Sequence, residues 1–352
     1  MSKFFSSRLT SLDAYVPGEQ PSDLQYIKLN TNESPFPPPQ TVIDAANHEA
    51  GNVNLYPNPQ GVNLVNRLAA HYNVSPENVI IGNGSDELLA FAFQAFFEGG
   101  VVFPDITYGF YPVYAKLYDV SYREIPLNDD FSINPADYTS IASNVIIANP
   151  NAPTGIALKP GEIEAVAESN PEHIVLIDEA YIDFGAESAI PLTEKYDNLL
   201  IIHTYSKSRS MAGARLGFAI GSTPVIDDLS KMKYSFNPYN VNRITQAMGA
   251  VALDEEDYFV NKRSEITAAR EYTSVQLKEM GFILTESKAN FLFGRHPDIN
   301  GFELYKNLKD RGILIRQWNK PRISDYVRIT IGTKDQMNSL IAAIGEILKE
   351  RG

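Results

Sequence analysis

The stretch Ile174-Val175-Leu176-Ile177-Asp178-Glu179-Ala180-Tyr181 is a run of four apolar residues that ends in two carboxylates. A short, continuously apolar run with polar residues at its end predicts a strand that is buried on both faces of a sheet. Open α/β sheets bind their ligands at the carboxyl ends of such strands. Asp178 is therefore a candidate functional residue, with a purely structural role as the alternative.

Other apolar runs on either side of this stretch predict further strands of the same sheet. They cover residues 78–81, 101–103, 145–148 and 199–203. Helix-length segments separate several of them, and residues 86–97 form an apolar helix directly after the first. This alternation predicts a parallel or mixed sheet with helices on both faces.

The pattern of predicted helices and strands changes beyond about residue 239. A long helix is predicted over residues 254–280, with Gly281 as its C-cap. Strands 290–293, 313–316 and 326–331, a helix over 302–311 and a last amphipathic helix follow. Together they predict a smaller α+β domain. The first forty residues, rich in Pro, Asn and Ser, predict an extended arm of the kind that lies across a neighbour.

Composition narrows the classes of function. The chain of 352 residues has a net charge of −13, which disfavours general binding to nucleic acid or to an anionic membrane. It has no cysteine, and its five histidines lack metal-ligand spacing, so no metal site is expected. No leader-like or membrane-spanning stretch is evident, and a cytoplasmic location is the default expectation.

The turn Gly82-Asn83-Gly84-Ser85-Asp86-Glu87 leads from a predicted strand into a predicted helix. Its glycines and free backbone N–H groups suit a phosphate, although an ordinary capped turn is an equal alternative on this motif alone. A dinucleotide fingerprint would need a third glycine where Glu87 stands. The P-loop ATPase alternative fails as well, because no Gly-x-x-x-x-Gly-Lys-Ser/Thr occurs in the chain.

The segment Thr204-Tyr205-Ser206-Lys207-Ser208-Arg209-Ser210-Met211-Ala212-Gly213-Ala214-Arg215 places a lysine after the apolar strand 199–203. An exposed lysine is the ordinary interpretation. Here Lys207 leaves a buried strand among hydroxyl side chains, and Arg215 follows eight residues later. An amine beside an anion site is therefore predicted.

These three motifs together resemble the fold type I pyridoxal-phosphate aminotransferases, over nearly the whole chain. That fold has a large domain with a mostly parallel seven-stranded sheet and a smaller α+β domain built from the N-terminal arm and the C-terminal part. The resemblance implies an arm at 1–30, a large cofactor-binding domain at 31–240 and a small domain at 241–352. Within the group, the chain is similar to the histidinol-phosphate aminotransferase family in the segments 29–35, 56–57, 84–87, 149–155, 178–181 and 327–333.

The resemblance implies a role for each residue around the pyridoxal ring. Lys207 would carry the cofactor as a Schiff base and move the proton of the substrate Cα. Asp178 would keep the pyridine nitrogen protonated. Tyr181 would reach the 3′ oxygen and Tyr108 would stack on the ring, although core packing is the alternative for both tyrosines. The family often has asparagine where this chain has Ala152, so Asn151 or Tyr181 is expected to replace it.

The resemblance also implies how the anionic groups are held. The cofactor phosphate would be bound by the residues Gly84, Ser85, Asp86, Ser206 and Arg215, with Tyr56 arriving from the other subunit of a homodimer. For the substrate, Arg328 would bind the α-carboxylate, and Arg316 with Tyr15 the phosphate, with Asn32 nearby. Lys320 and Arg322 are expected only to balance acids such as Asp325.

The function implied is a ping-pong transamination in histidine biosynthesis, between L-glutamate/2-oxoglutarate and imidazole-acetol phosphate/histidinol phosphate. A lyase similar to threonine-phosphate decarboxylase and an aromatic amino acid aminotransferase are alternatives. A catalytically inactive binding protein is a more remote one, because it would have little reason to retain Lys207, Asp178 and Arg215 together. An absorbance band at about 400 nm from the bound cofactor, expected from the resemblance, would distinguish an enzyme from an inactive binding protein.

Overall fold

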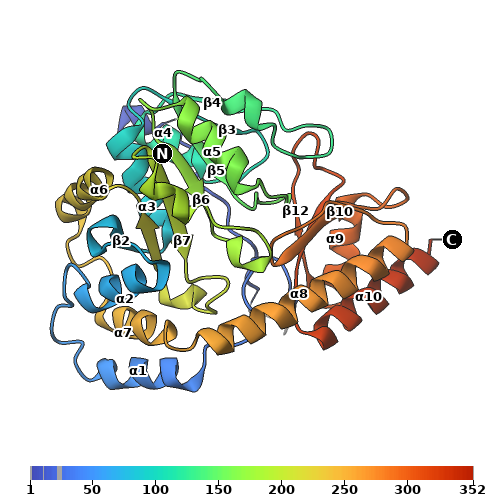
Figure 1. Cartoon of the computed structure of the whole chain (residues 1–352). Helices are drawn as coiled ribbons and strands as arrows, with labels where there is room; N and C mark the ends of the chain where they lie inside the picture. Colours follow the sequence, from blue (N-terminus) through green and yellow to red (C-terminus); the bar gives the residue numbers. More distant parts are fainter. Residues whose placement is uncertain (1, 11, 22–25, 352) are drawn as a thin grey trace.

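A seven-stranded sheet forms the centre of the computed structural model, which describes residues 2–10, 12–21 and 26–351 (Figure 1). In spatial order its strands are β2 (Val79–Asn83), β8 (Leu216–Ile220), β7 (Leu199–Thr204), β6 (Val175–Asp178), β5 (Asn144–Ala148), β3 (Val101–Pro104) and β4 (Tyr122–Ile125). Strands β7, β6, β5, β3 and β4 run parallel to one another, whereas β8 is antiparallel to its two neighbours, β2 and β7. The predicted mostly parallel sheet of seven strands is confirmed.

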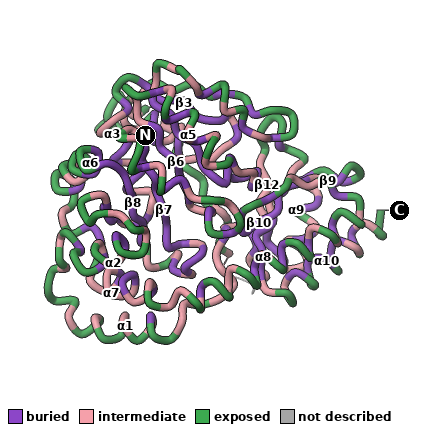
Figure 2. Tube along the Cα trace, in the orientation of Figure 1, coloured by how far each residue is buried: buried purple, intermediate pink, exposed green. Residues whose placement is uncertain are grey.

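Helices cover both faces of this sheet because its strands are apolar on both sides. One face packs against α2 (Val62–Tyr72), α5 (Pro160–Ser169) and α7 (Arg243–Ala252), and the other against α3 (Ser85–Phe96), α4 (Tyr111–Tyr118) and α6 (Thr223–Phe236). Along β7, Ile201 belongs to the first core and Ile202 to the second. The central strands are accordingly buried in Figure 2. Helix α1 (Gln40–Ala50) packs outside α7.

A smaller sheet with its own core follows in sequence. Its strands, in order, are β12 (Arg316–Gln317), β13 (Val327–Thr330), β10 (Phe291–Arg295) and β9 (Ile283–Leu284). It packs with α8 (Glu256–Glu279), α9 (Gly301–Asp310) and α10 (Lys334–Lys349). Helix α8 runs from α7 to lie beside α10 (Figure 1), so it contacts both cores.

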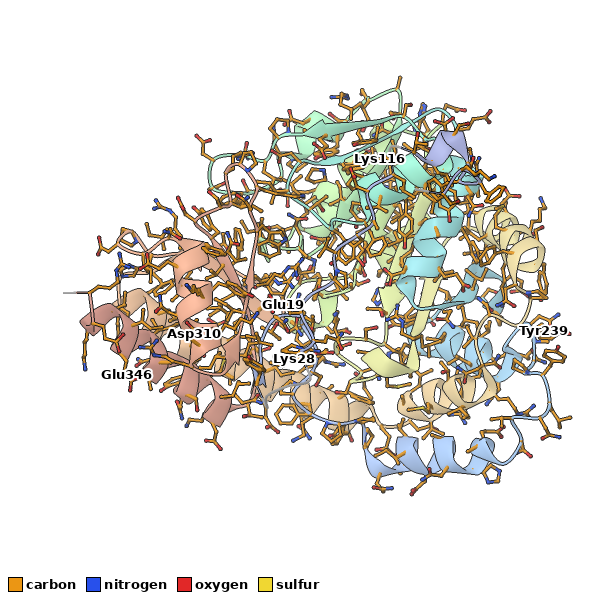
Figure 3. All side chains as sticks on the ribbon, turned by 180° about the vertical axis from the view of Figure 1, so that it is seen from behind. Glu19, Lys28, Lys116, Tyr239, Asp310 and Glu346 are labelled. Atoms are coloured by element: carbon orange, nitrogen blue, oxygen red, sulfur yellow. The ribbon has the colours of Figure 1, made fainter. Side chains whose placement is uncertain are left out.

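The N-terminal segment joins this smaller unit through β1 (Ile27–Lys28), which pairs in parallel with β11 (Ile313–Leu314). Figure 3 shows Glu19 and Lys28 between the two units. The domain boundary near residue 240 stays a prediction; α7, which lies beyond it, packs in the core of the large sheet. No helix within the described residues has the length and apolar character needed to cross a membrane.

One predicted strand is wrong. The single strand expected over residues 313–316 is two short strands, β11 and β12, which pair with different partners, β1 and β13. Ile315 lies between them, buried in the core of the small unit. The chain changes sheets at this residue because the segment before it pairs with β1 and the segment after it pairs with β13. This change positions Arg316 opposite Arg328.

Candidate active site

A cavity of about 460 Å³ opens at the carboxyl ends of β6 and β7. Eight of the residues proposed from the sequence line it: Ser85, Asp86, Tyr108, Asp178, Tyr181, Ser206, Lys207 and Arg215. They follow or end β3, β6 and β7, stand at the start of α3, or, for Arg215, directly precede the antiparallel β8. The parallel strands bring them together because their carboxyl ends share one edge of the sheet.

Asp178 ends β6 and is buried. The Tyr111 hydroxyl donates a hydrogen bond of 3.0 Å to its carboxylate, and the backbone N–H of Ala180 donates one of 3.2 Å. Burial nevertheless raises the pKa of the Asp178 carboxyl to about 6, against the effect of these two donors. A carboxylate held in this way would be stabilised by a cationic group in the cavity.

Lys207 follows β7 and enters the same cavity. Its amine donates a hydrogen bond of 3.2 Å to the backbone carbonyl of Thr31 and lies 5.8 Å from the ring centre of Tyr181. The Tyr181 hydroxyl in turn accepts a hydrogen bond of 3.0 Å from the Asn32 side-chain amide. The amine is therefore anchored by the N-terminal segment and faces a phenol.

The turn before α3 forms the other end of the cavity. Gly84 has a φ of +77°, a left-handed conformation that glycine adopts without strain, and Ser85 begins the helix. The first N–H groups of a helix have no partner within it and bind anions. The Asp86 carboxylate accepts hydrogen bonds of 2.8 Å each from the Tyr108 hydroxyl and from Arg215. It thereby ties together the ring proposed to stack on the cofactor and the guanidinium proposed to bind its phosphate.

A second cavity of about 430 Å³ adjoins the first, and Lys207, Tyr108 and Tyr181 line both. The four residues proposed for substrate binding line this second cavity: Tyr15, Asn32, Arg316 and Arg328. The small unit supplies the two arginines and the N-terminal segment supplies the other two. The two cavities together bring the amine of Lys207 and the carboxylate of Asp178 into one continuous site with the guanidinium groups of Arg316 and Arg328.

Arg316 and Arg328 lie directly opposite each other on β12 and β13. Burial holds the pKa of Arg328 below its ordinary value, and its Nε atom has no hydrogen-bond partner. Both guanidinium groups lie over the indole of Trp318, at 5.8 and 5.4 Å from the ring centre. Like charges opposite each other destabilise a sheet. An anion between them would relieve that repulsion and complete the partners of Arg328.

Three of the proposed residues line neither cavity: Gly84, which stands directly before Ser85, and Asn151 and Tyr56. Asn151 is buried, and its side-chain amide donates to the carbonyl of Ile106 and accepts from Thr107, at 2.9 and 2.8 Å. Tyr56 is 76% exposed and stacks on Tyr239, with ring centres 4.4 Å apart. Within this chain, Tyr181 is thus the better placed of the two groups proposed to compensate for Ala152.

Both side chains that were expected only to balance nearby acids, Lys320 and Arg322, line the second cavity. Arg322 pairs at 2.8 Å with Asp105 rather than with Asp325. No cluster of three or more histidine or carboxylate side chains that could hold a metal occurs in the part of the chain that the structure describes.

Sequence reasoning missed three residues of the site. Thr31 acts through its backbone carbonyl, which no side-chain pattern reveals. Tyr111 begins α4 three residues after Tyr108, and this close spacing could have indicated a second tyrosine at the site. Trp318 is the only tryptophan of the chain and stands two residues after Arg316, which could have marked it as a binding residue.

Comparison with known proteins agrees with this geometry. The family model for aminotransferase class I and II matches residues 25–344. A histidinol-phosphate aminotransferase of Brachyspira hyodysenteriae is 47% identical over 99% of this chain and 100% of its own length. One of Marinomonas sp. is 48% identical over 98% and 99%.

Solved structures show the same fold at lower identity. A histidinol-phosphate aminotransferase from Sinorhizobium meliloti, in complex with pyridoxal-5'-phosphate, has a TM-score of 0.88 at 24% identity, over 100% of this chain and 99% of its own. An L-threonine-O-3-phosphate decarboxylase from Porphyromonas gingivalis has a TM-score of 0.80 at 20% identity, over 92% and 99%. At such identities these two show the fold alone. On the match of the family model and the full-length relatives, the chain belongs to the class I and II aminotransferases and, within them, to the histidinol-phosphate aminotransferase family.

Proposed function

We propose that the protein is a pyridoxal-phosphate-dependent histidinol-phosphate aminotransferase. It exchanges an amino group between L-glutamate and imidazole-acetol phosphate, giving 2-oxoglutarate and histidinol phosphate. The observation that carries the proposal is one continuous site in which Lys207 lies between a buried carboxylate, Asp178, and a pair of opposed arginines. The family to which the chain belongs supports the substrate assignment.

The side chains of the first cavity fit pyridoxal phosphate. Asp178 would pair with the ring nitrogen, Tyr108 with the ring face, and Arg215, Ser206 and the turn at Gly84 with the phosphate. When bound, this cofactor withdraws electrons from the substrate Cα and so makes its proton acidic. The buried carboxyl of Asp178 supports the fit. Burial disfavours its ionised form, and a protonated ring nitrogen beside it would stabilise that form.

Lys207 performs the proton transfer in both half-reactions. Its Nζ atom accepts the proton from the substrate Cα and later returns one, while the carbonyl of Thr31 keeps the amine at the mouth of both cavities. The hydroxyl of Tyr181 can donate a hydrogen bond to the cofactor's 3′ oxygen while it accepts one from Asn32. These contacts orient the reacting groups and so lower the barrier by positioning.

The two arginines explain how one site can serve two substrates. Arg328 binds the α-carboxylate that glutamate presents, through two parallel hydrogen bonds. Arg316, with Tyr15, binds the phosphate of the other substrate. Both positions face Lys207 across the second cavity.

A direct assay tests the proposal against the lyase alternative, with which the chain shares its fold. Purified protein with pyridoxal phosphate is given glutamate and imidazole-acetol phosphate, and 2-oxoglutarate is measured. The same protein is given threonine O-3-phosphate, and CO₂ is measured. We expect 2-oxoglutarate without CO₂. Release of CO₂ at a comparable rate would identify a lyase. If neither product formed, the protein would be neither this aminotransferase nor this lyase.

The proposal includes a homodimer in which Tyr56 completes the neighbour's site, and a cytoplasmic location. Tyr56 and Tyr239 stack on each other, and the segments around both carry exposed apolar side chains that support an interface: Val53, Leu55, Val62, Tyr234 and Phe236. Exposed apolar groups that gather on one surface mark sites of association. Tyr239 lies at the outer edge of the large unit in Figure 3, away from the small unit.

A further inference from the structure

A second set of charged groups lies behind the site and lines neither cavity. Glu179 follows Asp178 directly, so its side chain points to the opposite face of the sheet. It is 1% exposed and contacts the His203 imidazole on β7 at 2.7 Å. The hydroxyl of Ser188 and the backbone N–H of Ala189 also donate to it, at 2.5 and 2.7 Å. The pair joins the ends of the two strands that carry Asp178 and Lys207.

Two more acids hold the turn that follows β7. We call residues 205–211 the lysine turn. Ser208, next to Lys207, is buried and donates a hydrogen bond to Asp183, which lies just beyond Tyr181. Arg209 is 5% exposed, donates to the carbonyl of Ala252 at 3.2 Å, and pairs with Glu256 at 2.7 Å in the first turn of α8.

The pair of Arg209 and Glu256 is ionised on both sides. Partial burial raises the pKa of Glu256, but the charges of Arg209 and Arg263 outweigh it and hold the pKa below its ordinary value. The guanidinium of Arg209 also lies 5.3 Å from the ring centre of Phe259 on α8. The same helix continues into the core of the small unit. Strands β12 and β13 of that unit carry Arg316 and Arg328.

We propose that Glu179, Asp183 and Glu256 form a positioning layer for Lys207. Each binds a residue of the strand or turn that presents the amine: His203, Ser208 and Arg209. The first two fix the distance from Lys207 to Asp178, because they tie the end of β7 to the segment after β6. The third ties the lysine turn to the helix that leads to the substrate arginines. The three acids line neither cavity, so they act on the site through the position of Lys207 relative to Asp178.

The positioning role rests on the proposed function and makes a distinct prediction. An amine that is displaced transfers the Cα proton less well, whereas glutamate is still bound by Arg328. Ser208→Ala and His203→Gln should therefore lower kcat roughly tenfold or more, with the KM for glutamate nearly unchanged. Ser208→Thr keeps the hydroxyl and should restore most of kcat.

Matched controls separate positioning from a general loss of packing. Ser222 is similarly buried and donates to the carbonyl of Asp197 at 2.9 Å, after β8 at the opposite edge of the sheet. His296 is 7% exposed and contacts the carbonyl of Met280 at 2.9 Å in the small unit. Ser222→Ala and His296→Gln should change the melting temperature as much as the test variants do and leave kcat unchanged.

A second measurement does not depend on turnover. Cofactor-free wild type and variants are treated with trinitrobenzenesulfonate, and the labelling rate of Lys207 is followed by peptide mass spectrometry. The proposal expects Ser208→Ala and His203→Gln to change that rate at least roughly threefold, with no change in the controls. Equal labelling rates, together with kcat values that match the controls, would overturn the positioning layer. Inactive wild-type enzyme would instead contradict the proposed function, and the labelling result would still decide the inference.

Discussion

Asp178 has opposite effects on the stability of the cofactor-free protein and on catalysis. Its pKa of about 6 in the folded chain lies above the ordinary value of 3.8. The folded protein therefore holds this proton more tightly than the unfolded chain, and the associated stability is lost as the pH rises from about 4 through 6. Above that range, the buried charge costs on the order of 3 kcal/mol.

The change Asp178→Asn tests this effect. We expect the cofactor-free variant to melt at a higher temperature than wild type at pH 7.5, and the difference to shrink at pH 5. Asparagine has the same size, and the Tyr111 hydroxyl can still donate to its amide oxygen; only the hydrogen bond from the backbone N–H of Ala180 is lost. Activity should fall far more than tenfold, because the partner of the ring nitrogen loses its charge. An increase in the activation free energy of less than about 1.4 kcal/mol would make Asp178 structural.

The two arginines should differ in which half-reaction they serve. Arg316→Ala should raise the KM for the phosphorylated substrate by roughly 10- to 100-fold and largely spare glutamate, because it removes a charge-assisted contact with phosphate. Arg328→Lys should weaken the binding of both substrates, since a point charge cannot reproduce a bidentate contact, either with the carboxylate of glutamate or with the phosphate, which Arg328 reaches from opposite Arg316. Steady-state kinetics of each half-reaction measures both effects.

The control for these variants is Arg311→Ala, which breaks an exposed pair with Glu350 at the end of α9. It should leave both half-reactions unchanged. If Arg316→Ala impaired glutamate as much as the phosphorylated substrate, Arg316 would not be the phosphate ligand.

At the scale of single elements, β8 supports the phosphate turn from behind. A Cβ atom on Gly217 would lie 2.4 Å from the backbone nitrogen of Ser85 and 2.6 Å from the carbonyl carbon of Gly84. Both neighbours are backbone, so the start of α3 would have to move. Gly217→Ala should weaken the binding of pyridoxal phosphate at least roughly tenfold, as measured by fluorescence titration.

Gly161→Ala on α5 is the control, because nothing lies within 4 Å of its Cβ position. That variant should bind the cofactor as wild type does, with equal or greater stability. Equal cofactor affinity of the two variants would show that the contact between β8 and the turn does not shape the phosphate site.

The elements that were predictable from sequence are those with an unbroken apolar pattern. The runs that became β5, β6 and β7 were recognised because Val, Ile and Leu dominate them and polar residues end them. Strand β8 was missed, since Gly217 and Ala219 interrupt its apolar run with small residues of low strand propensity. The division of 313–316 into two strands depends on pairing with β1 and β13, which no local pattern encodes.

In the candidate site, too, local patterns predict some features and tertiary contacts decide the others. Motif residues such as Lys207 and Asp178 stand at strand ends, and their meeting follows from the parallel sheet. The carbonyl of Thr31, which holds the lysine amine, comes from a segment 176 residues away and has no side-chain signature. The pairing of Glu179 with His203 could not be predicted either, because it depends on the register of β6 against β7. Sequence gives the chemistry of the strand ends, and tertiary structure gives the contacts that hold them.

At the scale of the whole molecule, the exposed position of Tyr56 predicts that two chains build each active site. Lys207→Ala and Tyr56→Ala should each have little activity when assayed alone at limiting cofactor. In a dimer formed from one chain of each, the chain with Tyr56→Ala keeps Lys207 and receives Tyr56 from its partner. One of the two sites is then complete.

Refolding the two variants together in equal amounts should therefore restore about a quarter of wild-type activity, since half of the dimers are mixed and each has one complete site. The control pairs Lys207→Ala with Asp178→Asn, whose altered residues both belong to the same chain's site. In that mixture every site lacks either the amine or the carboxylate, so no activity should return. No recovery with Tyr56→Ala would show that each chain builds its site alone, as would an active monomer in sedimentation. Recovery in the control would instead show that the Lys207 and Asp178 of one site do not belong to the same chain.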